Sequence, residues 1–472
     1  MAAIIDDSII NVDPDRIDFE DKDAVKNIII ALLSTIEHLV QENIKLREEN
    51  QQLRDEIAIL KGKKGKPKIR PNVPAREPLV PKPKSKGWSK ESKKDKVKVD
   101  RQVTVSVKST LPSDARFIGY RKVVIQDVIL KTDNVEYLLE RHYSPSRKKY
   151  YDAKLPEEVR GSQFGANLKA LTAILYISCR VTENKICQLY KDIGISISEG
   201  QISNIITKEK HAELAQEKQA IFETGMKHAE FIQTDETGAR HQGKNQYAHV
   251  ICNPYFTCYF MRPDKKRDTL KAIFGLGKDE RLSIPLITDD AKQYYNLSMI
   301  CCLCWIHEIR HYKKLNPYLG YYKHILDSFL RELFELYRII ILLFKNYHNG
   351  ILKEYILSRF EALIFKSYGY NELEQRLTVT WGNRDRLLQV LNYPNIPHHN
   401  NESEIAAREP VIKRKISYGT RSELGKCAWE NGLSIKDTCR KLGVSFVQHM
   451  YDIYSNSFAM PRLAEILTIV QS

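Results

Sequence analysis

Three segments far apart in the chain carry acidic residues where an apolar run ends or a polar turn begins. The segment FIQTDET contains Asp235, the segment IPLITDD contains Asp289, and the segment PHHNNESEIAAR contains Glu404. Strand alternation sends Glu236 to the face opposite Asp235. Hard cations such as Mg²⁺ take oxygen ligands, and a pair of them serves both the attacking and the leaving oxygen of a phosphoryl transfer. The three acids therefore predict a metal site with the chemistry of cutting and joining nucleic acid.

Neighbouring acids compete for two of these ligand positions. Asp290 directly follows Asp289, so either aspartate is a candidate for the second ligand. Glu402 lies two positions before Glu404, and residues two apart do not share one face of a helix. Only one acid of each pair is therefore expected in the site, and Asp290 and Glu402 remain the alternatives.

The composition indicates a large globular protein with an anionic partner. A chain of 472 residues is too long for one core and should hold about three domains. Its net charge of +15 favours nucleic acid or an anionic membrane as the partner. The most apolar run, IIILLF, is far shorter than the roughly 20 residues that span a bilayer, so we expect no membrane partner. The acidic start does not have the pattern of a signal peptide, and nine cysteines without framework spacing favour a reducing compartment.

A heptad pattern follows a loose acidic lead-in at residues 1–21 and predicts a dimerisation helix at 22–61. The leucines recur every seven residues, at Leu32, Leu39, Leu46, Leu53 and Leu60. The positions three before them hold Ile29, Ile36, Asn43, Asn50 and Ile57. Leucine at one seam position with isoleucine or asparagine at the other is typical of a parallel two-stranded coiled coil. The alternative is an amphipathic helix that packs on the chain's own globule.

Two segments of contrasting composition follow the heptads. Residues 62–101 are rich in lysine and proline and cannot build a core, so they are expected to form an extended basic linker. This linker either follows a phosphate backbone or is a solvated spacer. Residues 102–165 are expected to form a small β-rich unit, because polar and apolar residues alternate at 122–130 and 135–143.

Helical patterns dominate residues 166–226. Within them, 183–192 and 198–207 have the proportions of a helix-turn-helix, with Gly194 placed at the turn. Such a pair of helices either reads DNA or serves as a plain packing unit.

The remaining segments predict an α/β fold with a ribonuclease H-like catalytic core. Residues 227–305 read as strands with acids at their ends, and the break at Asn253 and Pro254 predicts a hairpin between two of them. Residues 306–392 are expected to form a helical insertion. Residues 393–472 complete the core with the third acid and a basic C-terminal helical region.

The chain resembles the DD(E)-type transposases of insertion-sequence family 66 from about residue 167 to residue 470. The resemblance is carried by TDET, by LITDD with a tyrosine after it, by LCWIHEIR and by HNNESEIAAREPVIKRKISYGTRSELGK, in this order. It implies Asp235, Asp289 and Glu404 as catalytic and metal-binding residues. It also implies two Mg²⁺ ions, for which Mn²⁺ can substitute. The implied supporting residues are Trp305, His307, Arg310, Asn400 and Asn401. The implied DNA-binding residues are Arg408, Lys413, Arg414, Lys415 and Arg421.

Several positions leave alternatives open or depart from the family. His307 and Arg310 share a helical face, where they support the acids or bind a phosphate, although His307 is equally compatible with a buried structural histidine. Ile405 takes the place of an arginine that members often have, and residues 102–165 lack the cysteines of the zinc module that many members carry.

The cysteines near the second acid were tested for a zinc pattern. Cys301, Cys304 and His307 have a suggestive spacing, but a structural zinc site needs four ligands and no second pair lies nearby. We therefore expect no zinc site.

Two functions from different classes remain. The first is a transposase that binds the ends of its element and a target DNA and transfers strands. It would act as a homodimer or higher synaptic assembly in the prokaryotic cytoplasm, at the nucleoid, with accessory proteins of the same element as further candidate partners. The second is a DNA-binding protein without catalysis, or an inactive copy. The three acids favour the enzyme, because a pure binding module has no reason to keep carboxylates where phosphates must approach.

Overall fold

The computed structural model describes residues 19–60, 99–106, 115–118, 120, 123–129, 131–156 and 161–471. Its contacts divide the chain into one unit made of Met1–Leu46 with Val135–Ser472 and a second unit, Arg47–Asn134. Most of the predicted lead-in and of the predicted basic linker lies outside the described residues. Within the described residues, no helix is both long and apolar enough to cross a membrane.

The heptad segment forms one continuous helix, α2, at Lys22–Leu60. Most of its length consists of residues with high helix propensity, and it contains neither proline nor glycine. The apolar seam positions face outward, for example Leu32 at 43% and Leu39 at 47% exposure. The helix prediction is therefore confirmed, whereas pairing with a second copy stays a prediction.

The predicted β-rich unit contains one short hairpin among its described residues. Strand β1, Arg141–Ser144, pairs antiparallel with β2, Lys149–Asp152. The strand prediction at 122–130 is wrong for the described residues 123–129, which form no ladder. Alternation in that stretch produces an apolar face, but nothing covers it, since Ile125 is 86% exposed. The prediction at 135–143 is right only from Arg141 onward.

The helical region begins with α3 at Ala166–Ile177 and contains the predicted helical pair. Helix α4 spans Glu183–Asp192 and α5 spans Glu199–Asn204, and a π-helical turn, η4, follows at Ile205–Glu209. Gly194 has a φ of +86° in the turn, which only glycine adopts without strain. The pair buries its apolar face in a small core made by Ile186, Tyr190, Ile202, Ile206 and Ala428. The long helix α6, His211–Lys227, then leads to the sheet.

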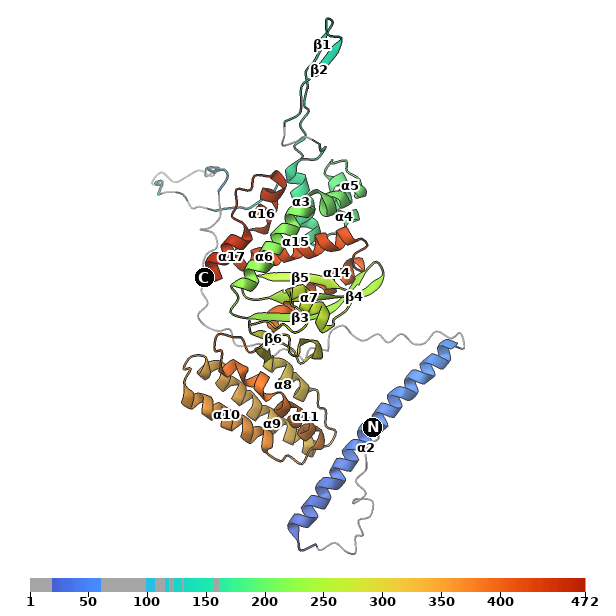
Figure 1. The fold of residues 1–472 in the computed structure, drawn as a ribbon, viewed down its shortest axis with the longest axis vertical. Helices are drawn as coiled ribbons and strands as arrows, with labels where there is room; N and C mark the ends of the chain where they lie inside the picture. Colours follow the sequence, from blue (N-terminus) through green and yellow to red (C-terminus); the bar gives the residue numbers. More distant parts are fainter. Residues whose placement is uncertain are drawn as a thin grey trace. The chain divides into compact units, whose positions relative to one another are not determined.

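The centre of the fold is a mixed sheet of five strands in the order β5-β4-β3-β6-β7 (Figure 1). The strands are β3 at Ile232–His241, β4 at Lys244–Cys252, β5 at Thr257–Arg262, β6 at Leu286–Thr288 and β7 at Cys301–Leu303. Strands β3, β4 and β5 pair antiparallel, and β6 and β7 continue the sheet parallel to β3. The turn between β3 and β4 uses two residues with positive φ, Gln242 and Gly243, as tight hairpins require.

Both faces of the sheet are buried, and alternate residues serve separate cores. Ile251, Cys258 and Phe260 belong to a core shared with α3, α6 and helix α7, Arg267–Phe274. Val250 and Tyr259 belong to the opposite core, which includes residues of α13, Asn401–Ala406, and α15, Glu423–Leu442. Other elements around the sheet are a 3-10 turn, η5, at Lys292–Tyr294 and helices α14 at Arg408–Ser417, α16 at Phe446–Ser455 and α17 at Leu463–Gln471.

Helix α15 covers the outer edge of β5, so this edge does not expose unpaired backbone groups. Three alternate N–H groups of the strand donate to side chains four residues apart on the helix. The pairs are Thr257 with Thr438 at 3.2 Å, Tyr259 with Ser434 at 3.0 Å, and Met261 with Glu430 at 2.7 Å. Figure 1 shows α15 lying along this side of the sheet, next to α6.

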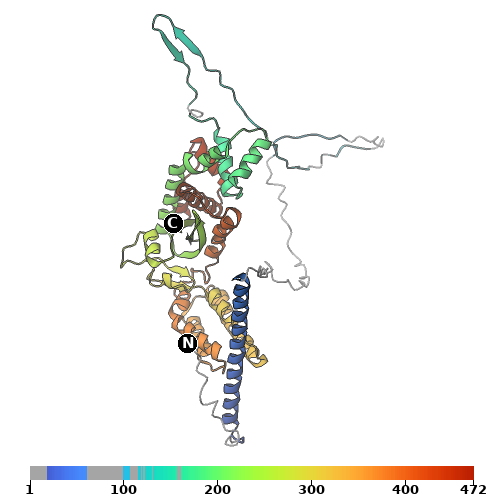
Figure 2. The same ribbon diagram turned by 90° about the vertical axis from the view of Figure 1, so that its right-hand side faces the viewer.

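The segment between the second and third acids is helical, as predicted, and begins directly after β7. Its long helices are α8 at Trp305–Lys313, α9 at Gly320–Arg338, α10 at Gly350–Phe365 and α11 at Asn371–Gly382. Its short turns are η6 at Ile339–Phe344, α12 at Arg384–Leu387 and η7 at Leu388–Leu391. These elements, here called the insertion, have a core of their own that includes Trp305, Phe329 and Phe360 (Figures 1 and 2).

Candidate active site

Asp235 is positioned by strand β3. The side chain of Gln233, two residues earlier on the same face, accepts a 3.5 Å hydrogen bond from the backbone N–H of Ser403 in α13. Alternation therefore directs Asp235 toward the face that carries α13. Its carboxylate accepts a hydrogen bond from the N–H of Glu236 at 2.9 Å. In residues 161–471 the structure gives Asp235 no ion-pair partner.

Asp289 follows strand β6 directly. Because β6 runs parallel to β3, with Gln233 opposite Ile287, the same register brings Asp289 beside Asp235, which lies within β3. Its carboxylate accepts a 3.1 Å hydrogen bond from the N–H of Ala291, and no cation pairs with it in the described part of the chain.

Asp290 is instead engaged in a network that joins the sheet to the insertion. Its carboxylate accepts hydrogen bonds from Asn383 at 2.8 Å, from Arg386 at 3.1 Å and from the hydroxyl of Tyr295 at 2.7 Å. These three partners satisfy most of its acceptor capacity. Of the two aspartates, Asp289 is the one whose oxygens remain available for a metal.

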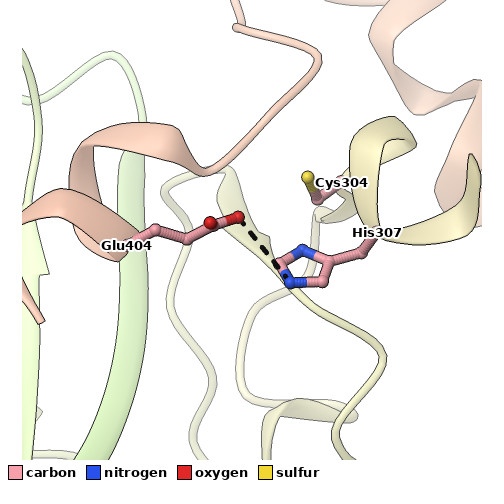
Figure 3. Close-up of side chains that lie close together, drawn as sticks. All are labelled: Cys304, His307 and Glu404. Carbon is pink, nitrogen blue, oxygen red and sulfur yellow. Dashed lines mark ion pairs between the residues drawn. The ribbon is translucent and has the colours of Figure 1, made fainter. Parts of the chain in front are cut away.

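Glu404 lies on α13 and faces the first helix of the insertion. The guanidinium of Arg310 donates to both carboxylate oxygens of Glu404, at 3.1 and 3.3 Å. The ring of His307 lies 3.7 Å from the same carboxylate, and the thiol of Cys304 lies to one side, within 4.8 Å of both (Figure 3). His307 and Arg310 therefore both contact Glu404, while their role in a reaction stays a prediction.

Glu402 has a different environment from Glu404. Its carboxylate accepts a 3.0 Å hydrogen bond from Lys441 of α15. The same ammonium group donates to the backbone oxygens of Asn253 and Phe256. Glu402 is thus part of a structural bridge between α13, α15 and the turn after β4.

Burial and several acidic neighbours change the pKa of Asp235. Burial, together with the negative charges of Glu236, Asp289 and Glu404, raises the pKa of Asp235 from 3.8 to about 7. Carboxylates are hard oxygen donors, and those of Asp235 and Asp289 have no cationic partner among the described residues, while Glu404 pairs with Arg310. Asp235, Asp289 and Glu404 thus fit the oxygen donor set that Mg²⁺ requires.

The raised pKa of Asp235 predicts a pH-dependent effect on stability. The folded protein retains this proton between about pH 4 and pH 7 while the unfolded chain has released it, so the stability contributed by Asp235 falls as the pH rises through this window. The Asp235→Asn variant removes the buried charge. In EDTA it should raise the free energy of unfolding by up to about 3 kcal/mol at pH 8 and change it little at pH 4. Urea denaturation at the two pH values measures this difference, and an equal effect at both would contradict it.

The other supporting residues have mainly structural contacts. Trp305 is 1% exposed and donates its indole N–H to the carbonyl of Leu387 at 2.9 Å, which fixes α8 against the end of α12. Asn400 is fully buried at the start of α13, and both polar atoms of its amide lack a protein partner. Asn401 is exposed. Among the described residues, no partner uses the hydrogen-bonding capacity of the buried Asn400 amide.

The predicted DNA-binding residues fall into two groups. Lys413 donates a 2.9 Å hydrogen bond to the hydroxyl of Tyr176, and its burial lowers its pKa to about 8. Arg414 donates to the carbonyl of Gly238 on β3 at 2.7 Å. These two side chains connect α14 to the rest of the fold. The exposed basic residues are Arg408, Lys415 and Arg421.

The sequence reasoning missed the contacts that surround the acids. Glu236 does point away from Asp235, but its carboxylate accepts hydrogen bonds from Gln293 at 2.5 Å and from the buried hydroxyl of Tyr294. Lys265 lies 3.7 Å from it. The tyrosine in the motif after LITDD was the available signal, although nothing local identified its partner.

The spacing of Cys301, Cys304 and His307 in the sequence suggested a possible zinc pattern. The structure groups Cys304 with His307 and Glu404, and their ligand atoms lie within 4.8 Å of one another. No fourth ligand joins this group among the residues that the structure describes. A closed structural zinc site requires four ligands, so this donor set does not fit one.

The fold and the site together define a mixed α/β protein with acids gathered beside the ends of its central strands. The sequence profile described as "Transposase IS66 family" matches residues 161–427, which is more than half of the chain. The chain therefore belongs to the IS66 family of transposases, as its motifs predicted.

The chain is also similar to "Uncharacterized protein y4jO" of Sinorhizobium fredii (strain NBRC 101917 / NGR234). It is 32% identical over 167 residues, which cover 35% of this chain and 51% of that protein. The present chain thus spans about half the length of this relative.

Proposed function

We propose that the chain binds the ends of its insertion sequence and catalyses metal-dependent strand cleavage and strand transfer with Asp235, Asp289 and Glu404. The observation that supports the proposal is the electrostatic influence of Asp289, after β6, and Glu404, on α13, on Asp235 of β3: burial first, and then the charges of Glu236, Asp289 and Glu404, raise the pKa of Asp235 to about 7. Asp290 has protein partners on both of its carboxylate oxygens, which supports the choice of Asp289. Glu404 is among the charges that raise the pKa of Asp235, which supports Glu404 as the third ligand although Arg310 pairs with it.

We further propose that the core is ribonuclease H-like. Three consecutive antiparallel strands, with the first of them in the middle of the sheet and two parallel strands added beside it, support this assignment. The first acid then lies on the central strand and the second directly after its parallel neighbour. The insertion separates them in sequence from the third acid.

The residues of the site have separate tasks in the proposed reaction. When bound, Mg²⁺, or Mn²⁺ in its place, would activate the attacking oxygen and stabilise the leaving oxygen of an in-line displacement. Asp235 and Asp289 would hold it from the sheet, and Glu404 from α13. Arg310 orients Glu404 and is 47% exposed, so it also has donors left for a DNA phosphate.

The binding surfaces are proposed from charge and exposure. Arg408, Lys415 and Arg421 would contact the DNA backbone, and the affinity should fall as salt rises. The outward-facing seam of α2 would pair with α2 of a second copy, since a homodimer or a larger assembly brings two element ends together. We propose a cytoplasmic, nucleoid-associated location, where these DNA partners are found.

Cleavage of DNA that carries the element's own ends tests the proposal. The full chain, with the other proteins of the element supplied, should nick this DNA in Mg²⁺ and not in EDTA. The Asp235→Asn variant should bind the DNA with unchanged affinity in a gel shift and should not cut it. Binding without any cutting by the parent chain would instead assign the protein to the non-catalytic DNA-binding class.

A further inference from the structure

Helix α2 has two faces with different environments. The seam positions Ile29 and Ile36 are 50% and 46% exposed. The adjacent face carries Ile30, Leu33 and Glu37, and Glu37 is 0% exposed. A helix that buried its heptad seam on its own globule would show the reverse pattern. The contact with the globule therefore uses a face that leaves Ile29 and Ile36 exposed.

The buried carboxylate of Glu37 caps the start of helix α9. It accepts hydrogen bonds from the backbone N–H of Tyr318 at 2.7 Å and from that of Leu319 at 3.0 Å. Leu319 is the N-cap residue of α9 and has no side-chain acceptor of its own. The first N–H groups of a helix lack intrahelical partners and carry a partial positive charge, so an anionic side chain is the favoured cap. Here a residue some 280 positions away along the chain supplies it.

Apolar contacts surround this cap. Leu33 packs against the core of the insertion. The carbonyl of Ile30 accepts a hydrogen bond from the hydroxyl of Tyr322 at 3.4 Å. The side chain of Ile30 also lies 3.4 Å from the point that a Cβ at Gly369 would occupy. Figure 2 shows the helix running beside the insertion helices.

We infer that the insertion is a docking surface for the dimerisation helix, and that the Glu37 cap holds each α2 on its own insertion while the heptad seam pairs with α2 of a second copy. The two faces are separate, so both contacts can exist at once. The regular heptads, with asparagines at positions 43 and 50 of the same seam, indicate another α2 as the occupant. The inference concerns the assembly and does not depend on the proposed chemistry.

Two helix contacts connect the docked helix α2 to the third acid, Glu404. Helix α9 packs on α8 through Phe329 and Tyr312, whose rings are 4.7 Å apart. Helix α8 carries Arg310, which binds Glu404. The cap at Glu37 therefore fixes the dimerisation helix to the same body that positions the third carboxylate.

Hydrogen exchange of the amides at Tyr318 and Leu319 tests the docking directly on the full chain. In the Glu37→Ala variant these amides should exchange at least tenfold faster, while sedimentation still gives the mass of the parent assembly. The milder Glu37→Gln variant keeps an acceptor and should give a smaller increase. The matched control is Glu42→Gln, an exposed position on the same helix, which should change neither readout.

A seam variant separates the two faces. Leu39→Asp should reduce the assembly to monomers without speeding exchange at Tyr318 and Leu319. Unchanged exchange in Glu37→Ala would overturn the docking. Loss of the assembly in Glu37→Ala, or faster exchange at the two amides in Leu39→Asp, would overturn the separation of the faces. None of these readouts requires DNA cleavage, so a failure here is distinct from a failure of the proposed reaction.

Discussion

The Asp289→Asn variant is expected to lose strand cleavage by at least about a thousandfold, roughly 4 kcal/mol of transition-state stabilisation, with little loss of fold stability. Among the described residues, the carboxylate of Asp289 has only the N–H of Ala291 as a partner, so an amide of the same shape leaves the fold intact. The lost charge, however, would remove one of the three proposed metal ligands.

Asp290→Asn is the matched control for this prediction. It should keep cleavage at a permissive temperature and lower the free energy of unfolding by about 1–3 kcal/mol, because Arg386 and Asn383 lose a charged acceptor. Cleavage assays and urea denaturation of both variants give the comparison. The reverse result, an active Asp289→Asn and an inactive but stable Asp290→Asn, would move the ligand assignment to Asp290.

The Glu404→Gln variant is expected to lose cleavage to a similar extent, again by about a thousandfold. Glutamine retains an acceptor for Arg310, so α13 and α8 should stay in contact and DNA binding should persist. The charge that a metal requires is absent. The measurement is single-turnover cleavage of element-end DNA in Mg²⁺, with a gel shift to verify binding.

Glu402→Gln provides the comparison for Glu404→Gln. Lys441 keeps the carbonyls of Asn253 and Phe256 as acceptors, so the expected cost to folding is only about 1 kcal/mol, and cleavage should remain within about threefold of the parent. An inactive Glu402→Gln together with an active Glu404→Gln would contradict the assignment of the third acid.

Local patterns in the sequence were sufficient for the elements that carry the acids. An apolar run of strand type that ends in a carboxylate predicted the position of Asp289 directly after β6, and the heptads predicted helix α2. The same pattern predicted a strand at Asp235 but not its length, because β3 continues past Asp235 to His241. These features depend on side-chain periodicity and on turn residues within a few positions of one another. The same reasoning failed at 123–129, because alternation alone does not supply the neighbouring strand that a ladder needs.

The partners of the acids could not be predicted, because each pair joins residues far apart in the chain. Asp290 meets Arg386, and Glu402 meets Lys441, only after the insertion and α15 have packed. Before folding, Asp289 and Asp290 are equivalent acids at the end of one strand. Tertiary packing distinguishes them by giving one of them cationic and amide partners.

The most direct test of the central claim, that Asp235, Asp289 and Glu404 bind one metal centre together, is iron-mediated mapping. Fe²⁺ exchanged into a Mg²⁺ site generates hydroxyl radicals in the presence of ascorbate and peroxide, and these radicals cut the nearest backbone. We predict three protein cuts, near residues 235, 289 and 404, that excess Mg²⁺ suppresses and that Asp289→Asn abolishes. Cuts near only one of these residues, or a pattern unchanged by Asp289→Asn, would contradict a shared site.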